Sequence, residues 1–113
     1  MDLTCIETPK GKLIIQIKGE MDAHGCERIH ASLEQTIDKA HHSHLLFDFS
    51  QVGMIDSAGI GLIVSLYKRL KAKGQALAII NVQSQPMEMM ALLRIDSVIP
   101  ISAELRRPGY RLL

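Results

Sequence analysis

The sequence predicts an α/β fold built on a mixed sheet of four or five strands. Short apolar segments typical of strands alternate with longer amphipathic segments typical of helices, and this order predicts parallel strand pairs with helices packed on the sheet. Only a turn separates the first two strand segments, which predicts one antiparallel hairpin. The chain has 113 residues, 47% of them hydrophobic and 22% charged. We therefore expect a single globular domain over residues 1–113.

Two segments at the start form the predicted hairpin, residues 4–7 and 12–18. In the second segment Leu13, Ile15 and Ile17 alternate with other positions, so we expect their side chains to share the buried face of a strand. A proline and a glycine in the intervening residues supply the chemistry of a tight turn.

A helix is predicted over residues 23–40, because apolar residues recur at every third or fourth position and form one stripe. Asp22 is its expected N-cap. The next segment, residues 45–49, is a nearly continuous apolar run of strand length. Such a run is typical of a buried central strand.

A second helix is predicted from Ser57 or Ala58 to about Lys73, with Gly74 as its C-terminal stop. Basic residues crowd its last turns, where they suit the negative end of the helix dipole: Lys68, Arg69, Lys71 and Lys73. Its apolar residues fall on more than one side, so we expect some of them to form an exposed contact patch: Ile60, Leu62, Ile63, Val64 and Leu66.

The remaining elements are shorter. Residues 76–81 are predicted to form another buried strand, and residues 84–94 a helix with a proline in its first turn. Residues 98–101 are predicted to form an edge strand, because Pro100 would interrupt a central one. The basic segment over about 105–113 contains a proline and a glycine, so we expect it to be weakly ordered.

Charge and composition narrow the function classes. The net charge is +1 and tryptophan is absent, so we expect no direct binding of nucleic acid. The sequence begins without a signal-peptide pattern and holds no apolar run of the roughly 20 residues that a spanning helix needs. We therefore expect a cytoplasmic protein without membrane insertion. Cys5 and Cys26 are expected to be reduced thiols, and we expect no cofactor.

The stretch MIDSAGIG, from Met54 to Gly61, is the strongest candidate for a functional site. It joins a buried strand to a long helix, and ligands of open α/β sheets gather at the carboxyl ends of strands. Ser57 is predicted to lie at the N-cap or in the first turn, among unpaired backbone N–H groups that favour an anionic phosphoryl group. Gly59 and Gly61 each cost up to ~1 kcal/mol relative to alanine, and they would let another backbone or a phosphate come close.

Other interpretations of these residues stay open. Serine is a common N-cap, and Gly61 could simply let the helix pack tightly on the sheet. A hydrolase nucleophile would need a glycine two positions before and after the serine; Gly59 fits this pattern, but position 55 is isoleucine. The methionines at 87–90 are typical of core filling or of an adaptable protein-binding surface. The histidines at 41–44 are interpreted as polar loop residues, and we expect no metal site.

Three segments resemble the STAS domain family and, within it, the bacterial anti-sigma factor antagonists. They are GEMDAH at 19–24, LLFDFSQVGMIDSAGIGLIVSLYKRLKAKG at 45–74 and ALLRIDSVIPI at 91–101. The resemblance covers nearly the whole chain up to about Glu104. It implies a STAS-like single domain, in which helices pack mainly on one face of the mixed sheet.

The resemblance implies that Ser57 is the phosphoacceptor of a partner switch. In such systems the unphosphorylated antagonist binds an anti-sigma factor that is also a serine kinase, and a sigma factor is released. Phosphorylation then ends the binding, and a PP2C-type phosphatase restores the hydroxyl. On this reading the protein is a substrate and a binding partner, not an enzyme. The same domain also occurs as a non-phosphorylated adaptor or scaffold subunit, for example in lipid-transport complexes.

The resemblance also assigns supporting roles around Ser57. Asp22 and Asp56 match acidic positions of the family, and we expect them to orient the loop or tune its charge. The site-supporting residues are expected to be Asp22, Asp56, Gly59 and Gly61, and the partner contacts Met54, Ala58, Ile60 and Met87.

Overall fold

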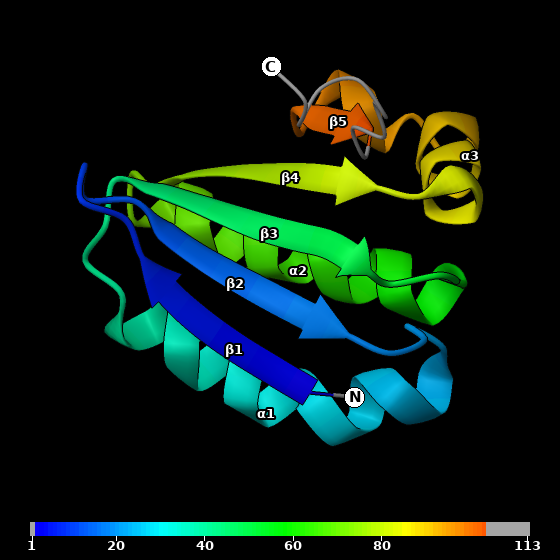
Figure 1. The fold of residues 1–113 in the computed structure, drawn as a ribbon, viewed down its shortest axis with the longest axis horizontal. Coiled ribbons are helices and arrows are strands. Elements are labelled where there is room, and N and C mark those ends of the chain that lie inside the picture. The colour runs from blue at the N-terminus through cyan, green and yellow to red at the C-terminus, as the bar shows by residue number, and fades with distance from the viewer. Residues whose placement is uncertain (1, 104–113) are drawn as a thin grey trace, which may run out of the picture.

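The computed structural model describes residues 2–103, which form a five-stranded sheet with three α-helices and one 3-10 helix (Figure 1). In chain order the elements are β1 (Asp2–Glu7), β2 (Leu13–Lys18), α1 (Ala23–Lys39), β3 (His44–Gln51), α2 (Ser57–Ala72), β4 (Ala76–Val82), α3 (Ser84–Leu92), η1 (Ile95–Ser97) and β5 (Ile101–Ala103). The predicted weakly ordered segment over about 105–113 lies outside the described residues.

The sheet has the strand order β1-β2-β3-β4-β5. β1 runs antiparallel to β2, whereas the other neighbouring pairs are parallel. Figure 1 shows α1 and α2 on the same face of the sheet, and α3 beyond the carboxyl end of β4. The predicted mixed sheet with helices mainly on one face is confirmed, and so is the opening hairpin.

The core lies between the sheet and these two helices. Leu13, Ile15 and Ile17 of β2 are buried on this face, as the alternation predicted. β3 is central, as predicted, but its burial alternates: Phe47 is fully buried, whereas its neighbour Asp48 is only half-buried. The apolar run at 45–49 therefore does not mark a strand buried equally on both faces. The reason is that α1 and α2 cover the same side of the sheet.

The first helix follows its predicted stripe, with Cys26, Ile29 and Leu33 among its buried residues. Asp22 is its N-cap, as predicted, because the carboxylate accepts a hydrogen bond from Gly25 N at 2.7 Å. At the other end of α1, Lys73 Nζ donates hydrogen bonds to backbone carbonyl oxygens. The bond to Ile37 O is 2.7 Å long. Lys73 therefore caps a neighbouring helix in addition to standing near the end of its own.

The predicted contact patch on the second helix is wrong. Ile60, Leu62, Ile63 and Leu66 are all buried, and only Val64 of the predicted set is half-buried. α2 buries two sides because it packs on the sheet with one and against α1 with the other. Its end is as predicted, since Gly74 follows with a left-handed φ of 74°.

The last strand begins later than predicted, at Ile101 instead of Val98. Pro100 precedes it and offers only an acceptor, its carbonyl oxygen, which receives a hydrogen bond from Ile79 N at 2.9 Å. β5 is the edge strand that the proline predicted.

Candidate functional site

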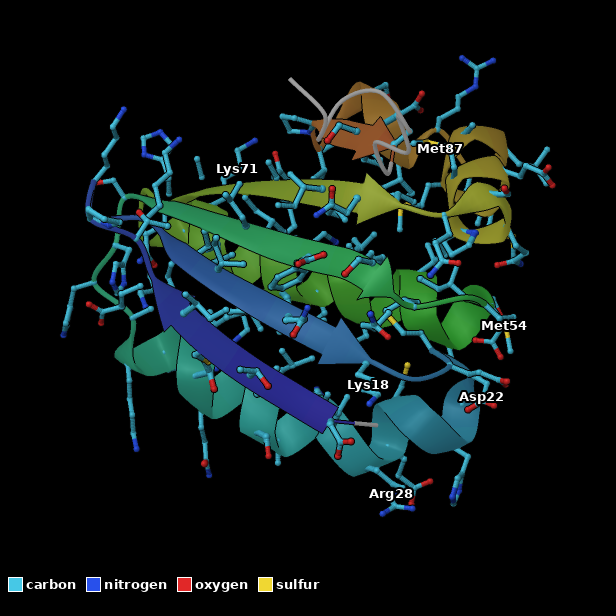
Figure 2. All side chains as sticks on the ribbon, in the orientation of Figure 1. Lys18, Asp22, Arg28, Met54, Lys71 and Met87 are labelled. Atoms are coloured by element: carbon cyan, nitrogen blue, oxygen red, sulfur yellow. The ribbon has the colours of Figure 1, made fainter. Side chains whose placement is uncertain are left out.

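A short bridge holds the candidate loop against the start of α1. Met21 and Ile55 form an isolated parallel bridge, in which Met21 N donates to Met54 O at 2.9 Å and Asp56 N donates to Met21 O at 3.2 Å. The bridge continues the pairing of β2 with β3 beyond their ends. Since α1 begins two residues after Met21 and α2 two residues after Ile55, the N-termini of both helices meet at the carboxyl edge of the sheet (Figure 1). Asp22 and Met54 lie at this edge in Figure 2.

Ser57 is the first residue of α2 and is exposed. The residue before it, Asp56, is the N-cap: its Oδ1 accepts hydrogen bonds from Ala58 N at 2.9 Å and Gly59 N at 3.2 Å. The interpretation of Ser57 as the cap is therefore wrong, and its first-turn placement is confirmed. The expectation of unpaired N–H groups around Ser57 is wrong for Ala58 and Gly59, because the Asp56 carboxylate accepts from both. The hydroxyl group of Ser57 is left free of any capping role.

The two glycines of α2 serve different purposes. A Cβ atom on Gly59 would lie 2.5 Å from Met21 O and 2.5 Å from Ile55 Cγ1, closer than real contacts allow. Gly59 is thus required by the close approach of α2 to the Met21–Ile55 bridge, not by an outside backbone or phosphate. A Cβ atom on Gly61 would meet nothing within 4 Å, so tight packing on the sheet does not explain this glycine.

The expected partner contacts separate into exposed and buried positions. Met54, three residues before Ser57, and Ala58, directly after it, are half-buried, so parts of both side chains are accessible. Ile60 is only 7% exposed and belongs to the core, which contradicts its expected role as a surface contact. Met87 lies on α3 and is half-buried against the core (Figure 2).

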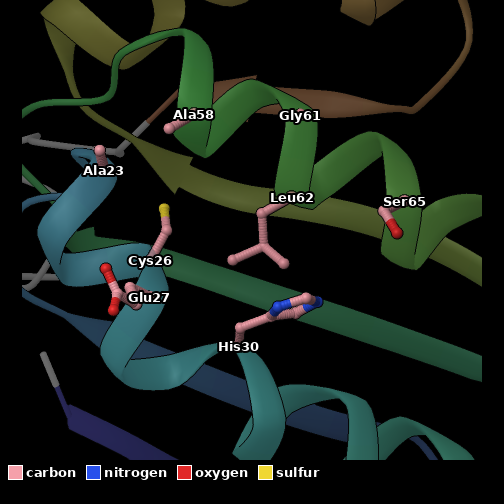
Figure 3. A pocket seen from close by; sticks show the side chains of 8 residues that line it. All are labelled: Ala23, Cys26, Glu27, His30, Ala58, Gly61, Leu62 and Ser65. Carbon is pink, nitrogen blue, oxygen red and sulfur yellow. The ribbon is translucent and has the colours of Figure 1, made fainter.

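A groove of about 440 Å³ runs between α1 and α2, and Ala58, the residue after Ser57, is part of its lining (Figure 3). Small residues keep it open, and its lining comprises Ala23, Cys26, Glu27, His30, Ala58, Gly61, Leu62 and Ser65. Cys26 is a free, buried thiol. Burial raises the pKa of Cys26, and the carboxylates of Asp56 and Asp22 raise this pKa further. The two N-caps therefore place negative charge at one end of the groove.

One residue that the sequence analysis did not single out also contacts the candidate loop. Gln85, in the first turn of α3, accepts a hydrogen bond from Ile55 N through Oε1 at 2.8 Å and donates one to Ile55 O through Nε2 at 3.0 Å. An alternation of amide residues in the sequence, Asn81, Gln83 and Gln85, is the signal that could have drawn attention to it.

Two of the histidines are paired with glutamates. His30 Nε2 lies 2.9 Å from Glu34 Oε2, and His42 Nε2 lies 3.6 Å from Glu7 Oε1. Within residues 2–103 no three His, Cys, Asp or Glu side chains are grouped closely enough to hold a metal ion. None of the helices in the described part of the chain has the length and apolar character to cross a membrane.

Comparisons with known proteins agree with this architecture. The anti-sigma F factor antagonist of Paenibacillus polymyxa is 24% identical over 96 residues, which cover 85% of this chain and 82% of that protein. The solved structure of the anti-sigma factor antagonist SpoIIAA in its unphosphorylated form matches with a TM-score of 0.72 and 16% identity, over 98% of this chain and 93% of that chain. The Bacillus cell fate determinant SpoIIAA in the phosphorylated form matches with a TM-score of 0.66 and 16% identity, over 98% and 96%.

At this level of identity the solved structures establish a common fold. The family is established by the sequence itself, because the model of the STAS domain matches residues 4–107, which include all the helices described above and every strand apart from the first two residues of β1. This chain belongs to the STAS domain family.

Proposed function

We propose that the protein is an anti-sigma factor antagonist whose binding is switched off by phosphorylation of Ser57. The observation that carries the proposal is the exposed Ser57 hydroxyl at the start of α2, beside a cap formed by a different residue. Modification of this hydroxyl breaks no capping interaction. The proposal is supported by the Paenibacillus polymyxa relative, which is named an anti-sigma F factor antagonist, and by the match to SpoIIAA in both its unphosphorylated and phosphorylated forms.

The proposed partner is an anti-sigma factor with serine kinase activity, and the proposed site of action is the cytoplasm. The unphosphorylated protein docks through the surface around Ser57, to which Met54, Ala58 and Gly61 contribute accessible atoms. Asp22 and Asp56 order the two helix starts beneath this surface. Met87 on α3 extends the proposed contact surface. A PP2C-type phosphatase is proposed to reverse the modification.

Electrostatic repulsion explains why phosphorylation should weaken binding and not strengthen it. A phosphoserine carries about −1.5 to −2 charges near pH 7. On Ser57 this charge would stand next to the Asp56 carboxylate and inside the docking surface, so repulsion and desolvation oppose binding. The positive end of the α2 dipole offsets part of the charge within the free protein. Binding is therefore expected to fail while the fold persists.

Phosphorylation by a purified serine-kinase anti-sigma factor from the protein's own genome tests the proposal. With ATP, we expect one added phosphate, located on Ser57 by peptide mapping and absent from Ser57→Ala. Ser97 provides a matched control because Ile95–Ser97 repeats the tripeptide Ile-Asp-Ser, but the Ser97 hydroxyl donates to Arg94 O at 2.7 Å. Ser97→Ala should be phosphorylated like the wild type.

This experiment, together with an assay of ester hydrolysis, separates the alternative functions. Binding to the kinase without modification would instead indicate an adaptor or scaffold subunit. Ester hydrolysis that depends on Ser57 would indicate a hydrolase. The geometry does not favour the hydrolase: within residues 2–103 no histidine is hydrogen-bonded to Ser57, and His30 and His42 are paired with glutamates.

A further inference from the structure

The loop that presents Ser57 needs a partner on the β4 side. The strand pairing of β3 with β4 ends at Asp48 and Ile80. β4 then diverges from β3 at Asn81, which takes a left-handed φ of 58°, while Val82 still pairs with Ala103 of β5 and α3 starts at Ser84. Within residues 2–103, the main-chain partner of the loop before Ser57 then lies on the β2 side, in the Met21–Ile55 bridge.

On the side that faces β4, amide side chains take the place of strand pairing. Asn81 Nδ2 donates to Asp48 Oδ1 at 3.2 Å, and Gln83 Nε2 donates to Ser50 O at 2.7 Å. The partners of these amides come progressively closer to Ser57 along the chain. Gln85 is the last of them and the only one of the three that uses both its acceptor and its donor on a single peptide segment.

The geometry at Ile55 has the form of a strand pairing. In an extended chain the N–H and C=O groups of one residue point to the same side. Those of Ile55 point to Gln85, while Met54 O and Asp56 N on either side of it point to Met21. Ile55 is fully buried, so its two polar groups would lose a partner if the Gln85 amide were removed.

We infer that Gln85 is a positioning residue for the phosphoacceptor: its side-chain amide completes the backbone pairing of Ile55 and so fixes the loop that presents Ser57 to the kinase. This inference rests on the proposed function. Gln85 touches neither Ser57 nor the transferred phosphate in this role. It lowers the cost of binding, because the kinase meets a loop that is already ordered.

The test compares Gln85→Leu with Gln75→Leu. Leucine and glutamine have similar helix propensity, so the first variant removes both hydrogen bonds without weakening α3. Gln75 is the matched control: its Nε2 donates to Ala40 O at 3.0 Å and His42 O at 2.7 Å, and it precedes β4, away from the Ser57 loop. Gln85→Glu retains the acceptor for Ile55 N–H and should have an intermediate effect.

Two measurements decide the outcome. Amide hydrogen exchange at Ile55 should become about 10-fold faster in Gln85→Leu and stay unchanged in Gln75→Leu; tenfold corresponds to about 1.4 kcal/mol. In the phosphorylation assay with the kinase that modifies the wild type, KM for Gln85→Leu should rise about 5- to 10-fold with kcat within twofold, because an ordered loop favours binding. General destabilisation would affect both leucine variants alike.

Different results would contradict the role of Gln85 and the proposed function. Unchanged exchange at Ile55, or an unchanged KM for Gln85→Leu against a wild type that is phosphorylated on Ser57, overturns the role of Gln85 and leaves the proposed function standing. A wild type that no serine-kinase anti-sigma factor binds or modifies overturns the proposed function. In that case exchange at Ile55 still decides whether Gln85 positions the loop.

Discussion

At the scale of single residues, Gly59 and Gly61 offer opposite predictions two positions apart. Gly59→Ala should lower the free energy of unfolding by about 1–3 kcal/mol, because the new Cβ would meet Met21 O and Ile55 Cγ1 at 2.5 Å. Gly61→Ala should raise it by about 0.5–1 kcal/mol, since the site is open and alanine favours the helix. Urea denaturation measures both. Shifts of the same sign would contradict the contrast between a crowded and an open site.

Asp56 carries a second prediction at this scale. Asp56→Ala should lower the free energy of unfolding by about 1 kcal/mol, because Ala58 N and Gly59 N lose their capping oxygen. Asp56→Asn keeps a capping oxygen and should stay close to the wild type. Thermal and urea unfolding of the two variants give the comparison. If both were equally destabilised, the charge of Asp56 and not its cap would be what stabilises the start of α2.

At the scale of elements, Lys73 links the ends of two helices. Its Nζ lies 2.7 Å from Ile37 O, 3.2 Å from Asp38 O and 3.3 Å from Ala40 O. Lys73→Met should therefore lower the free energy of unfolding by about 1 kcal/mol, because carbonyl groups at the end of α1 lose their donor. Lys71→Met is the control from the same helix, since Lys71 lies over the ring of Tyr67 at 5.9 Å and bonds none of these carbonyls. Equal urea midpoints for the two variants would contradict the cross-helix cap.

The elements also show what a sequence can and cannot predict here. β2 and α1 were predictable because the spacing of their apolar residues follows from the period of a strand or a helix. Asp22 was predictable as a cap because capping involves only residues nearby in the chain. The roles of Gly59 and Gln85 were not, because their partners, Met21 O and Ile55, come close only through the order of strands in the sheet.

At the scale of the whole molecule, one added charge should change association without changing the fold. Ser57 is exposed and Asp56 supplies the cap, so Ser57→Asp should shift the free energy of unfolding by no more than about 0.5 kcal/mol. Circular dichroism should be unchanged. Affinity for the serine-kinase anti-sigma factor should fall about 5- to 150-fold, the range of a coupling of 1–3 kcal/mol.

The neutral variant Ser57→Asn tests whether charge or size causes this loss. Asparagine is close to aspartate in size but carries no charge, so it should bind more tightly than Ser57→Asp. Raising the salt concentration screens exposed charges over a Debye length of about 10 Å at 0.1 M, and it should narrow the difference between the two variants. Isothermal titration at two salt concentrations measures this directly. If Ser57→Asn bound as weakly as Ser57→Asp at both concentrations, steric fit at the start of α2 would govern docking, and the electrostatic switch would be wrong.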